Sequence, residues 1–228
     1  MQKNLLVFTL LLITLSAVRC KKNTDTTPPV TTDYQPLTAG SEWNYMVTGT
    51  NAGAFKVTAT SKDSVISGRT YKVFTNSSAA NEYYYKSSGD YFRYNSIKEL
   101  NNQLVEVLYL KDNLAKGQTW TETKTVNINM GPPLGTIPGT VQFLFTVVDK
   151  GIDYIVDGVT FKDVIKIKAE PAFSVLVLGT PTSVPSTSDL QYFYSKNVGL
   201  IYSKTILTIP AASINASSET KLGVYTIK

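Results

Sequence analysis

The sequence predicts a mainly all-β protein with little helix, folded as an internally duplicated antiparallel sheet that is curved or closed into a partly open barrel. Three observations support this fold class: strand-forming residues dominate, aromatic runs flank glycine turns, and short blocks recur in one order. Only 17% of the residues are charged, and no segment combines Ala, Leu, Glu and Lys as surface helices do. The 228 residues are enough for one larger β domain.

The clearest predicted hairpin is the stretch 191–204, QYFYSKNVGLIYSK. Apolar and aromatic runs flank its Asn-Val-Gly turn, in which glycine supplies the positive φ that a tight turn requires. The stretch 82–92, EYYYKSSGDYF, has a similar pattern, and aligning the two glycines places Tyr84 opposite Tyr194. The recurrence predicts that the chain contains a duplicated β unit.

Two further blocks recur in the same order. The motif Leu-x-x-Gly-x-x-Trp contains both tryptophans of the protein, Trp43 and Trp120. The motif Gly-x-Thr-aromatic-Lys occurs at 68–72 and again at 158–162. Each tryptophan motif predicts a turn around glycine that delivers a large aromatic side chain onto the first strand of a half.

The repeats predict two similar halves, about 37–110 and 114–228, within a single β domain that spans residues 34–228. A half on its own would leave its strand edges open, so we expect the halves to share one sheet. Two segments of the second half, Met130–Gly139 and Thr180–Ser188, are rich in Gly, Pro and Ser and are predicted to be loops. Asp157-Gly158 predicts a tight hairpin.

The N-terminus has the pattern of a secretion signal. A positive residue, Lys3, precedes eleven mostly apolar residues and a pair of small residues, so residues 1–19 are predicted to be a signal peptide. Eleven residues are too few to cross a bilayer, which takes about 20 in a helix. Residues 20–33 lack periodicity and are rich in Thr and Pro, which predicts an extended tether.

Cys20 is the single cysteine of the protein and has no partner for a disulfide. Its place directly after the leader, followed by two lysines, resembles the lipid-modified first residue of Bacteroidota lipoproteins. The resemblance implies attachment to the membrane through two or three acyl chains at Cys20. Because Arg19 stands where the usual motif has a small residue, cleavage after Ala17 without a lipid is the alternative.

Further motifs extend this resemblance to most of the mature chain. These are Tyr-x-Pro-Leu-x-x-Gly-x-x-Trp-x-Tyr at 34–45, Gly-x-Thr-Phe-Lys-x-Val-Ile at 158–165 and Tyr-x-Lys-x-Val-Gly-Leu-Ile at 194–201. They resemble uncharacterised Bacteroidota envelope lipoproteins, which are similar to the curved-sheet half-barrels of the LolA and LppX kind. The resemblance implies an outer-membrane lipoprotein with a concave β surface for lipid or another apolar ligand, and it implies no reaction. Thr26 and Ser64 resemble O-glycosylation positions of that phylum.

The composition argues against several function classes. The chain contains no His, which removes the commonest general base and metal ligand, and it has no glycine-rich phosphate loop. We therefore expect no enzyme, no cofactor and no bound metal. The formal charge of +5 includes Lys3 and Arg19 of the leader, and the other lysines are spread along the chain, which argues against nucleic-acid binding. Four aspartates between 149 and 163 lack the spacing of an EF-hand.

The aromatic runs leave two hypotheses for function. Tyr84 and Tyr194 are the candidate ligand-facing residues. In the alternative interpretation, every second residue of each run fills the core, and the others pair across strands at the surface. A carrier for an apolar ligand predicts a cavity that side chains leave unfilled. A surface protein that recognises a glycan or another envelope component instead predicts a filled interior and an exposed aromatic patch.

Overall fold

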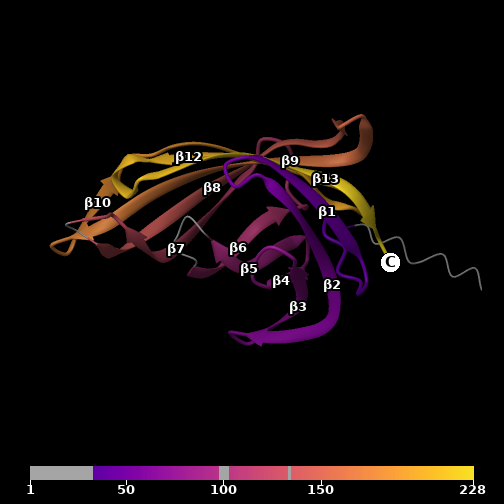
Figure 1. Ribbon diagram of the computed structural model, residues 1–228, viewed down its shortest axis with the longest axis horizontal. Helices are drawn as coiled ribbons and strands as arrows, with labels where there is room; N and C mark the ends of the chain where they lie inside the picture. Colours follow the sequence, from indigo (N-terminus) through magenta and orange to yellow (C-terminus); the bar gives the residue numbers. More distant parts are fainter. Residues whose placement is uncertain (1–32, 98–102, 133–134) are drawn as a thin grey trace, which may run out of the picture.

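The computed structural model describes residues 33–97, 103–132 and 135–228, which form one antiparallel sheet of 13 strands (Figure 1). The first six strands are β1 (Glu42–Gly49), β2 (Gly53–Ile66), β3 (Arg69–Asn76), β4 (Glu82–Ser87), β5 (Asp90–Ile97) and β6 (Gln103–Lys111). The next seven are β7 (Thr119–Asn129), β8 (Thr136–Val156), β9 (Val159–Val177), β10 (Thr180–Val184), β11 (Thr187–Ser195), β12 (Gly199–Ile209) and β13 (Ile214–Thr226). A 3₁₀ turn, η2 (Pro210–Ala212), lies between β12 and β13.

The strand order shows how the two parts of the chain combine. It runs β6-β5-β4-β3-β2-β1-β13-β12-β11-β9-β8-β7, and β10 pairs with β9 beside this path. The pairing of β1 with β13 joins the first meander to the second. The sheet curves until β6 and β7 face each other across one unsealed seam, which makes a nearly closed barrel. The predicted fold class, a mainly β protein with a partly open antiparallel barrel, is confirmed.

Two hydrogen bonds cross the seam between β6 and β7. The indole Nε1 of Trp120 donates to the carbonyl oxygen of Leu108 at 2.9 Å, and this contact is buried. Near the other end, the backbone N–H of Asn127 donates to Oε1 of Gln103 at 2.9 Å. Open strand edges present unpaired backbone groups, so these side chains replace part of the missing ladder.

Four hairpins turn on two residues that both have positive φ: 67–68, 88–89, 157–158 and 178–179. This is the type I′ turn, whose twist matches that of the flanking strands. At Asp157 and Gly158 the φ angles are 45° and 85°, which confirms the predicted hairpin. Asp157 also forms an ion pair with Lys221 at 2.8 Å.

The two tryptophan motifs have matching local structures. The backbone N–H of Gly40 donates to the carbonyl oxygen of Ala59 at 2.8 Å, and that of Gly117 donates to the carbonyl oxygen of Val147 at 2.7 Å. The φ angles of the two glycines are 84° and 83°. Each following strand then places its tryptophan in the core, at 1% exposure for Trp43 and 9% for Trp120. The match agrees with the predicted repeat, although the origin of the halves by duplication stays a prediction.

The prediction of loops at Met130–Gly139 and Thr180–Ser188 is wrong for much of both segments. Residues 136–139 belong to β8, and residues 180–184 form β10 against the end of β9. Proline does not prevent this, because β10 is an edge strand and an edge tolerates a missing N–H donor. The Leu178-Gly179 turn sends the chain back along β9, which is long enough to pair with it.

Odd-numbered residues at the start of β9 face the core, with one interruption. Phe161, Ile165 and Ile167 are buried as expected. Asp163 has φ of 49°, the register against β8 shifts nearby, and the next residue, Val164, is fully buried. The irregular residue interrupts the alternation locally, and the same parity faces the core before and after it.

Within residues 33–97, 103–132 and 135–228, none of the helical structure has the length and apolar character needed to cross a bilayer.

Gly49 at the end of β1 provides a test of the junction between the two meanders. A Cβ there would lie 2.2 Å from the carbonyl oxygen of Ser217, and the φ of Gly49 is +83°. We expect Gly49→Ala to lower the free energy of unfolding by about 2–4 kcal/mol, since collision and positive φ both contribute. Gly68→Ala is the control, because Gly68 has φ of +78° and open space around it, so only about 1–2 kcal/mol should be lost. If urea denaturation shows that both variants lose the same free energy of unfolding, the close approach of β1 to β13 is contradicted.

Candidate ligand-binding cavity

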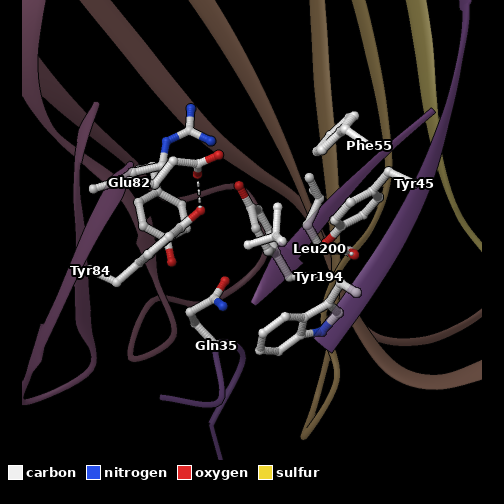
Figure 2. A pocket seen from close by; sticks show the side chains of 11 residues that line it. Gln35, Tyr45, Phe55, Glu82, Tyr84, Tyr194 and Leu200 are labelled. Atoms are coloured by element: carbon white, nitrogen blue, oxygen red, sulfur yellow. Dashed lines mark hydrogen bonds between the residues drawn. The ribbon is translucent and has the colours of Figure 1, made fainter. Parts of the chain in front are cut away.

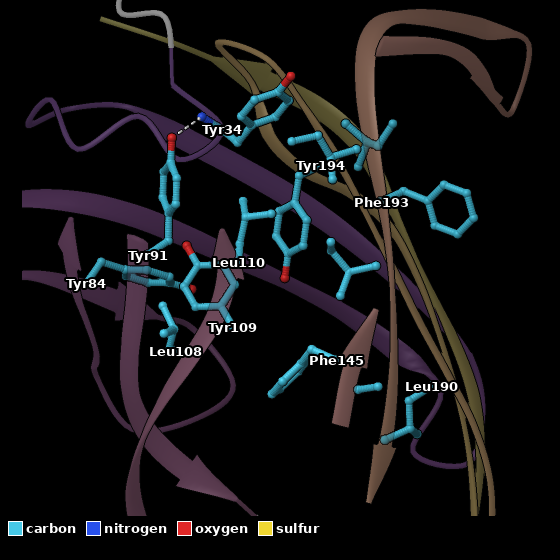
Figure 3. Close-up of a cluster of buried hydrophobic side chains, with 14 of the residues drawn as sticks. Tyr34, Tyr84, Tyr91, Leu108, Tyr109, Leu110, Phe145, Leu190, Phe193 and Tyr194 are labelled. Atoms are coloured by element: carbon cyan, nitrogen blue, oxygen red, sulfur yellow. Dashed lines mark hydrogen bonds between the residues drawn. The ribbon is translucent and has the colours of Figure 1, made fainter. Parts of the chain in front are cut away.

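Asp33, the last residue of the predicted tether, and Tyr34 after it pack against one end of the barrel, so the extended tether ends before Asp33. The backbone N–H of Tyr34 donates to the hydroxyl of Tyr91 at 3.1 Å, and that hydroxyl donates to Asp112 at 2.5 Å (Figure 3). The backbone N–H of Asn197 donates to the carbonyl of Asp33 at 2.7 Å. Asp33 and Tyr34 are buried, so this segment packs into the barrel end as part of the fold.

Side chains of β1 attach this end to the β11–β12 hairpin. Trp43 Nε1 donates to the carbonyl of Val198 at 2.6 Å, and the hydroxyl of Tyr45 donates to the carbonyl of Leu200 at 3.0 Å. Both acceptors lie in or next to the turn that the sequence predicts around Gly199. The hairpin is therefore held by side-chain bonds as well as by its own strands.

The structure brings the two candidate aromatics, Tyr84 and Tyr194, into the same interior cluster. Their rings contact Tyr109 from two sides, with centroid distances of 6.2 Å from Tyr84 and 5.5 Å from Tyr194 (Figure 3). Both line a small cavity of about 60 Å³ together with Tyr45 and Phe55 (Figure 2). All three clustered tyrosines are buried, and a larger space lies elsewhere between the strands.

That larger space is a cavity of about 460 Å³ between the two meanders. Ligand pockets typically measure about 300–1,000 Å³ and are mostly apolar with a few polar groups. The apolar lining comes from five strands and consists of Phe55, Phe143, Pro171, Phe173, Leu190, Leu207 and Ile209. The remaining lining residues are Arg93, Asn95, Ser96, Tyr192, Thr205 and Ser218. Tyr84 and Tyr194 are not part of this lining.

Arg93 on β5 is the charged residue at the inner end of the cavity. It lines the large cavity, the small cavity beside Tyr84, and a third cavity of about 70 Å³ beside Phe145. Its neighbours across the strands are Tyr84 on β4 and Val107 on β6. Arg93 therefore lies where the three spaces meet.

Several polar atoms around these cavities have no hydrogen-bond partner within the described part of the protein. They are Arg93 Nε, Asn95 Oδ1 and the Tyr109 hydroxyl, all buried. A buried polar group without a partner costs about 1–3 kcal/mol, so such groups are uncommon in cores. Their collection along one wall is the feature expected of a site that receives a polar group from outside.

Glu82 on β4 sets the local electrostatics. Its two carboxylate oxygens accept hydrogen bonds from Asn76 at 2.8 Å and from the hydroxyl of Tyr84 at 2.6 Å. Burial acts to lower the pKa of Arg93, but Coulomb attraction to Tyr84 and Glu82 outweighs it and raises that pKa above its ordinary value. Burial raises the pKa of Tyr84, Tyr109 and Tyr194 well above that of free tyrosine. At neutral pH the site therefore presents a guanidinium cation and neutral hydroxyl groups.

Sequence reasoning missed Arg93. The signal was present, because alternation along 90–97 (DYFRYNSI) places Arg93 on the same face as Tyr91 and Asn95.

The other predicted positions that the structure describes do not line this cavity. Cys20 and Thr26 lie outside the described residues. Ser64 is half-buried in β2, opposite Tyr71 in β3. Three of the four aspartates near the β8–β9 hairpin pair with lysines, namely Asp149 with Lys116, Asp153 with Lys162, and Asp157 with Lys221. Among the residues described, no group of three or more His, Cys, Asp or Glu side chains could hold a metal.

The fold and the cavity define a class, that of nearly closed antiparallel β-barrels with an internal, mostly apolar cavity. No protein-family model matches the chain, and no curated protein sequence matches it. The chain is similar to a solved structure described as a "putative lipoprotein" from Parabacteroides distasonis ATCC 8503. The identity is 15% over 86% of this chain and 99% of the other, with a TM-score of 0.51, which shows a shared fold.

A second solved structure is described as a "putative exported protein" with a YmcC-like fold from Bacteroides fragilis NCTC 9343. It is 8% identical over 84% of this chain and 97% of the other, with a TM-score of 0.37, and this superposition is too loose to establish a shared fold. The resemblance to LolA and LppX stays a prediction.

Proposed function

We propose that this protein is a non-catalytic carrier or binding module of the cell envelope that holds an apolar ligand inside its barrel. The observation that supports this most directly is the cavity of about 460 Å³ between the meanders, walled largely by aromatic and aliphatic side chains. Tightly packed interiors leave few spaces larger than a water molecule, so an apolar space of this size is typical of ligand binding. Of the two hypotheses from the sequence, the carrier is the one that predicts such a space.

The proposed location is the outer membrane, with Cys20 as the lipid attachment site. The predicted leader, the position of the cysteine, and the "putative lipoprotein" description of the similar Parabacteroides structure support it. The tether would reach the barrel at Asp33, which lies at the closed end. An extended chain of this length spans roughly 40 Å, so the closed end would face the membrane and the larger cavity would lie further from it.

One observation favours the alternative of a surface interaction protein. Half-buried aromatics gather on the outer face of β4 and β5, and the guanidinium of Arg69 lies 4.4 Å from the ring centre of Phe92 and 5.1 Å from that of Tyr85. Aromatic side chains gathered on an outer face would suit a glycan. The alternative predicts binding that a change inside the barrel leaves intact.

Filling the cavity tests the proposed function. We expect Leu207→Trp to reduce the affinity for the neutral fluorescent probe N-phenyl-1-naphthylamine at least about tenfold, because the indole occupies the ligand space. Ile206→Trp is the matched control, since the adjacent position faces the opposite side of β12 and should keep wild-type affinity. If Leu207→Trp is poorly folded by circular dichroism, Leu190→Phe provides the same test. Absence of binding by the wild-type protein would refute the proposal.

A further inference from the structure

Arg93 is placed as a receptor for a negatively charged group at the inner end of the cavity. Among the described residues, its buried Nε has no hydrogen-bond partner, and neither has the hydroxyl of Tyr109, a residue that lines the two smaller spaces beside Arg93. The Arg93 guanidinium carbon lies 5.9 Å from the centre of the Tyr109 ring, so the two groups are neighbours. A guanidinium and a hydroxyl together match the oxygens of a carboxylate, which accept charge-assisted hydrogen bonds.

The rest of the cavity has the opposite character. Phe143, Phe173, Leu190 and Leu207 line the same space as Arg93 and offer no charge. A ligand that satisfies both parts must be polar at one end and apolar along the remainder. A purely apolar ligand would leave Arg93 Nε without a hydrogen-bond partner in the described part of the protein, which is costly.

Resting on the proposed function, we propose that the cavity binds a fatty-acid-like amphiphile, with its carboxylate against Arg93 and the Tyr109 hydroxyl and its hydrocarbon chain among the apolar residues toward the other end. Glu82 limits the negative charge that this site accepts. Its carboxylate is held by Asn76 and Tyr84, and its charge opposes that of an incoming carboxylate. The site is therefore selective for one anionic head and unsuited to a headgroup with several negative charges.

The matched arginine is Arg69, the other arginine of the described chain. It pairs with Glu106 at 2.5 Å and stacks on Phe92, the residue before Arg93, so it lies on the outer face of the barrel. Arg69→Gln removes the same charge from the protein without changing the cavity. It separates the local effect of Arg93 from a general effect of net charge.

The test compares oleate with oleyl alcohol, which has the same chain without the carboxylate, by isothermal titration calorimetry on the full folded domain. We expect Arg93→Gln to weaken oleate binding about 10- to 100-fold, as the loss of a charge-assisted hydrogen bond implies, and to leave oleyl alcohol binding within about twofold. Arg69→Gln should change neither. Tyr109→Phe should weaken oleate binding by a smaller factor without lowering thermal stability, because it removes a hydroxyl that has no partner in the protein.

Glu82→Gln gives a readout that a structural role of Arg93 would not produce, since removing the opposing charge should strengthen oleate binding and leave the alcohol unaffected. If the wild type and Arg93→Gln bind oleate and the alcohol equally well, the carboxylate site is refuted while the carrier function stands. If oleyl phosphate binds tighter than oleate, the assignment of a singly charged carboxylate is overturned. If neither lipid nor the neutral probe binds, both proposals fail.

Discussion

Raising the pH from about 9 to about 12 is expected to unfold this protein cooperatively. Burial and the hydrogen bond to Glu106 raise the pKa of Tyr71 from 10.0 to about 12, and burial and Glu219 raise that of Tyr202 to about 12. The interior tyrosines, whose pKa values are also raised by burial, are Tyr45, Tyr84, Tyr91, Tyr109 and Tyr194. When a tyrosine has a higher pKa in the folded than in the unfolded state, the free energy of unfolding falls once the pH is high enough to ionise it in the unfolded chain.

The sign follows from the protons bound in each state. Above pH about 10 the unfolded chain loses phenolic protons that the folded chain retains, so the free energy of unfolding falls as the pH rises. Each tyrosine with a folded pKa at or above about 12 costs roughly 2–3 kcal/mol at pH 12. Because several interior tyrosines are shifted in the same direction, their combined cost is comparable to the whole stability of a typical domain, about 5–15 kcal/mol.

Phenolate absorbance and far-ultraviolet circular dichroism, followed together against pH, check this prediction. The buried phenolates should appear in the same narrow pH range in which the strand signal is lost. Tyr109→Phe should remain folded to a slightly higher pH, because it removes one titrating group whose hydroxyl has no partner in the described structure. Ionisation of all tyrosines near pH 10 with the fold intact would show that the interior aromatic cluster is misplaced.

Replacing Trp43 by alanine is expected to lower the free energy of unfolding by about 3–5 kcal/mol, as for other buried aromatic residues. Trp43 is 1% exposed, stacks on Phe74 with 5.8 Å between centroids, and donates its indole N–H to Val198 across the junction of the two meanders. The change thus removes core volume and a link between β1 and the β11–β12 hairpin. Denaturant unfolding followed by circular dichroism measures the loss.

Two further variants separate these contributions. Trp43→Phe keeps an aromatic ring but leaves the Val198 carbonyl without its donor, so about 1–3 kcal/mol should be lost. Val65→Ala is the surface control, since Val65 is 72% exposed and should change stability by no more than about 0.5 kcal/mol. A loss at Trp43→Ala as small as the control value would contradict the position of Trp43 in the core.

The local features of the barrel could be predicted because they depend on neighbouring residues. The Asp157-Gly158 hairpin follows from the few residue types that accept positive φ, and the faces of β2 follow from the alternation of Val57 and Ala59 with polar residues. The failure at Thr180–Ser188 has the same explanation. Pro and Ser indicate a loop locally, but the exposed edge of β9 offered a partner that local pattern cannot reveal.

By itself the sequence determined that the chain is a β protein built on glycine turns, with the aromatic hairpins where they are found. Only the tertiary structure decided that β1 pairs with β13, that the seam falls between β6 and β7, and that Arg93 faces the same interior as Tyr109 and Leu207. The physical reason is that turn and strand preferences act over a few residues. The pairing of β1 with β13, and the cavity between the two meanders, depend instead on contacts between residues more than a hundred positions apart.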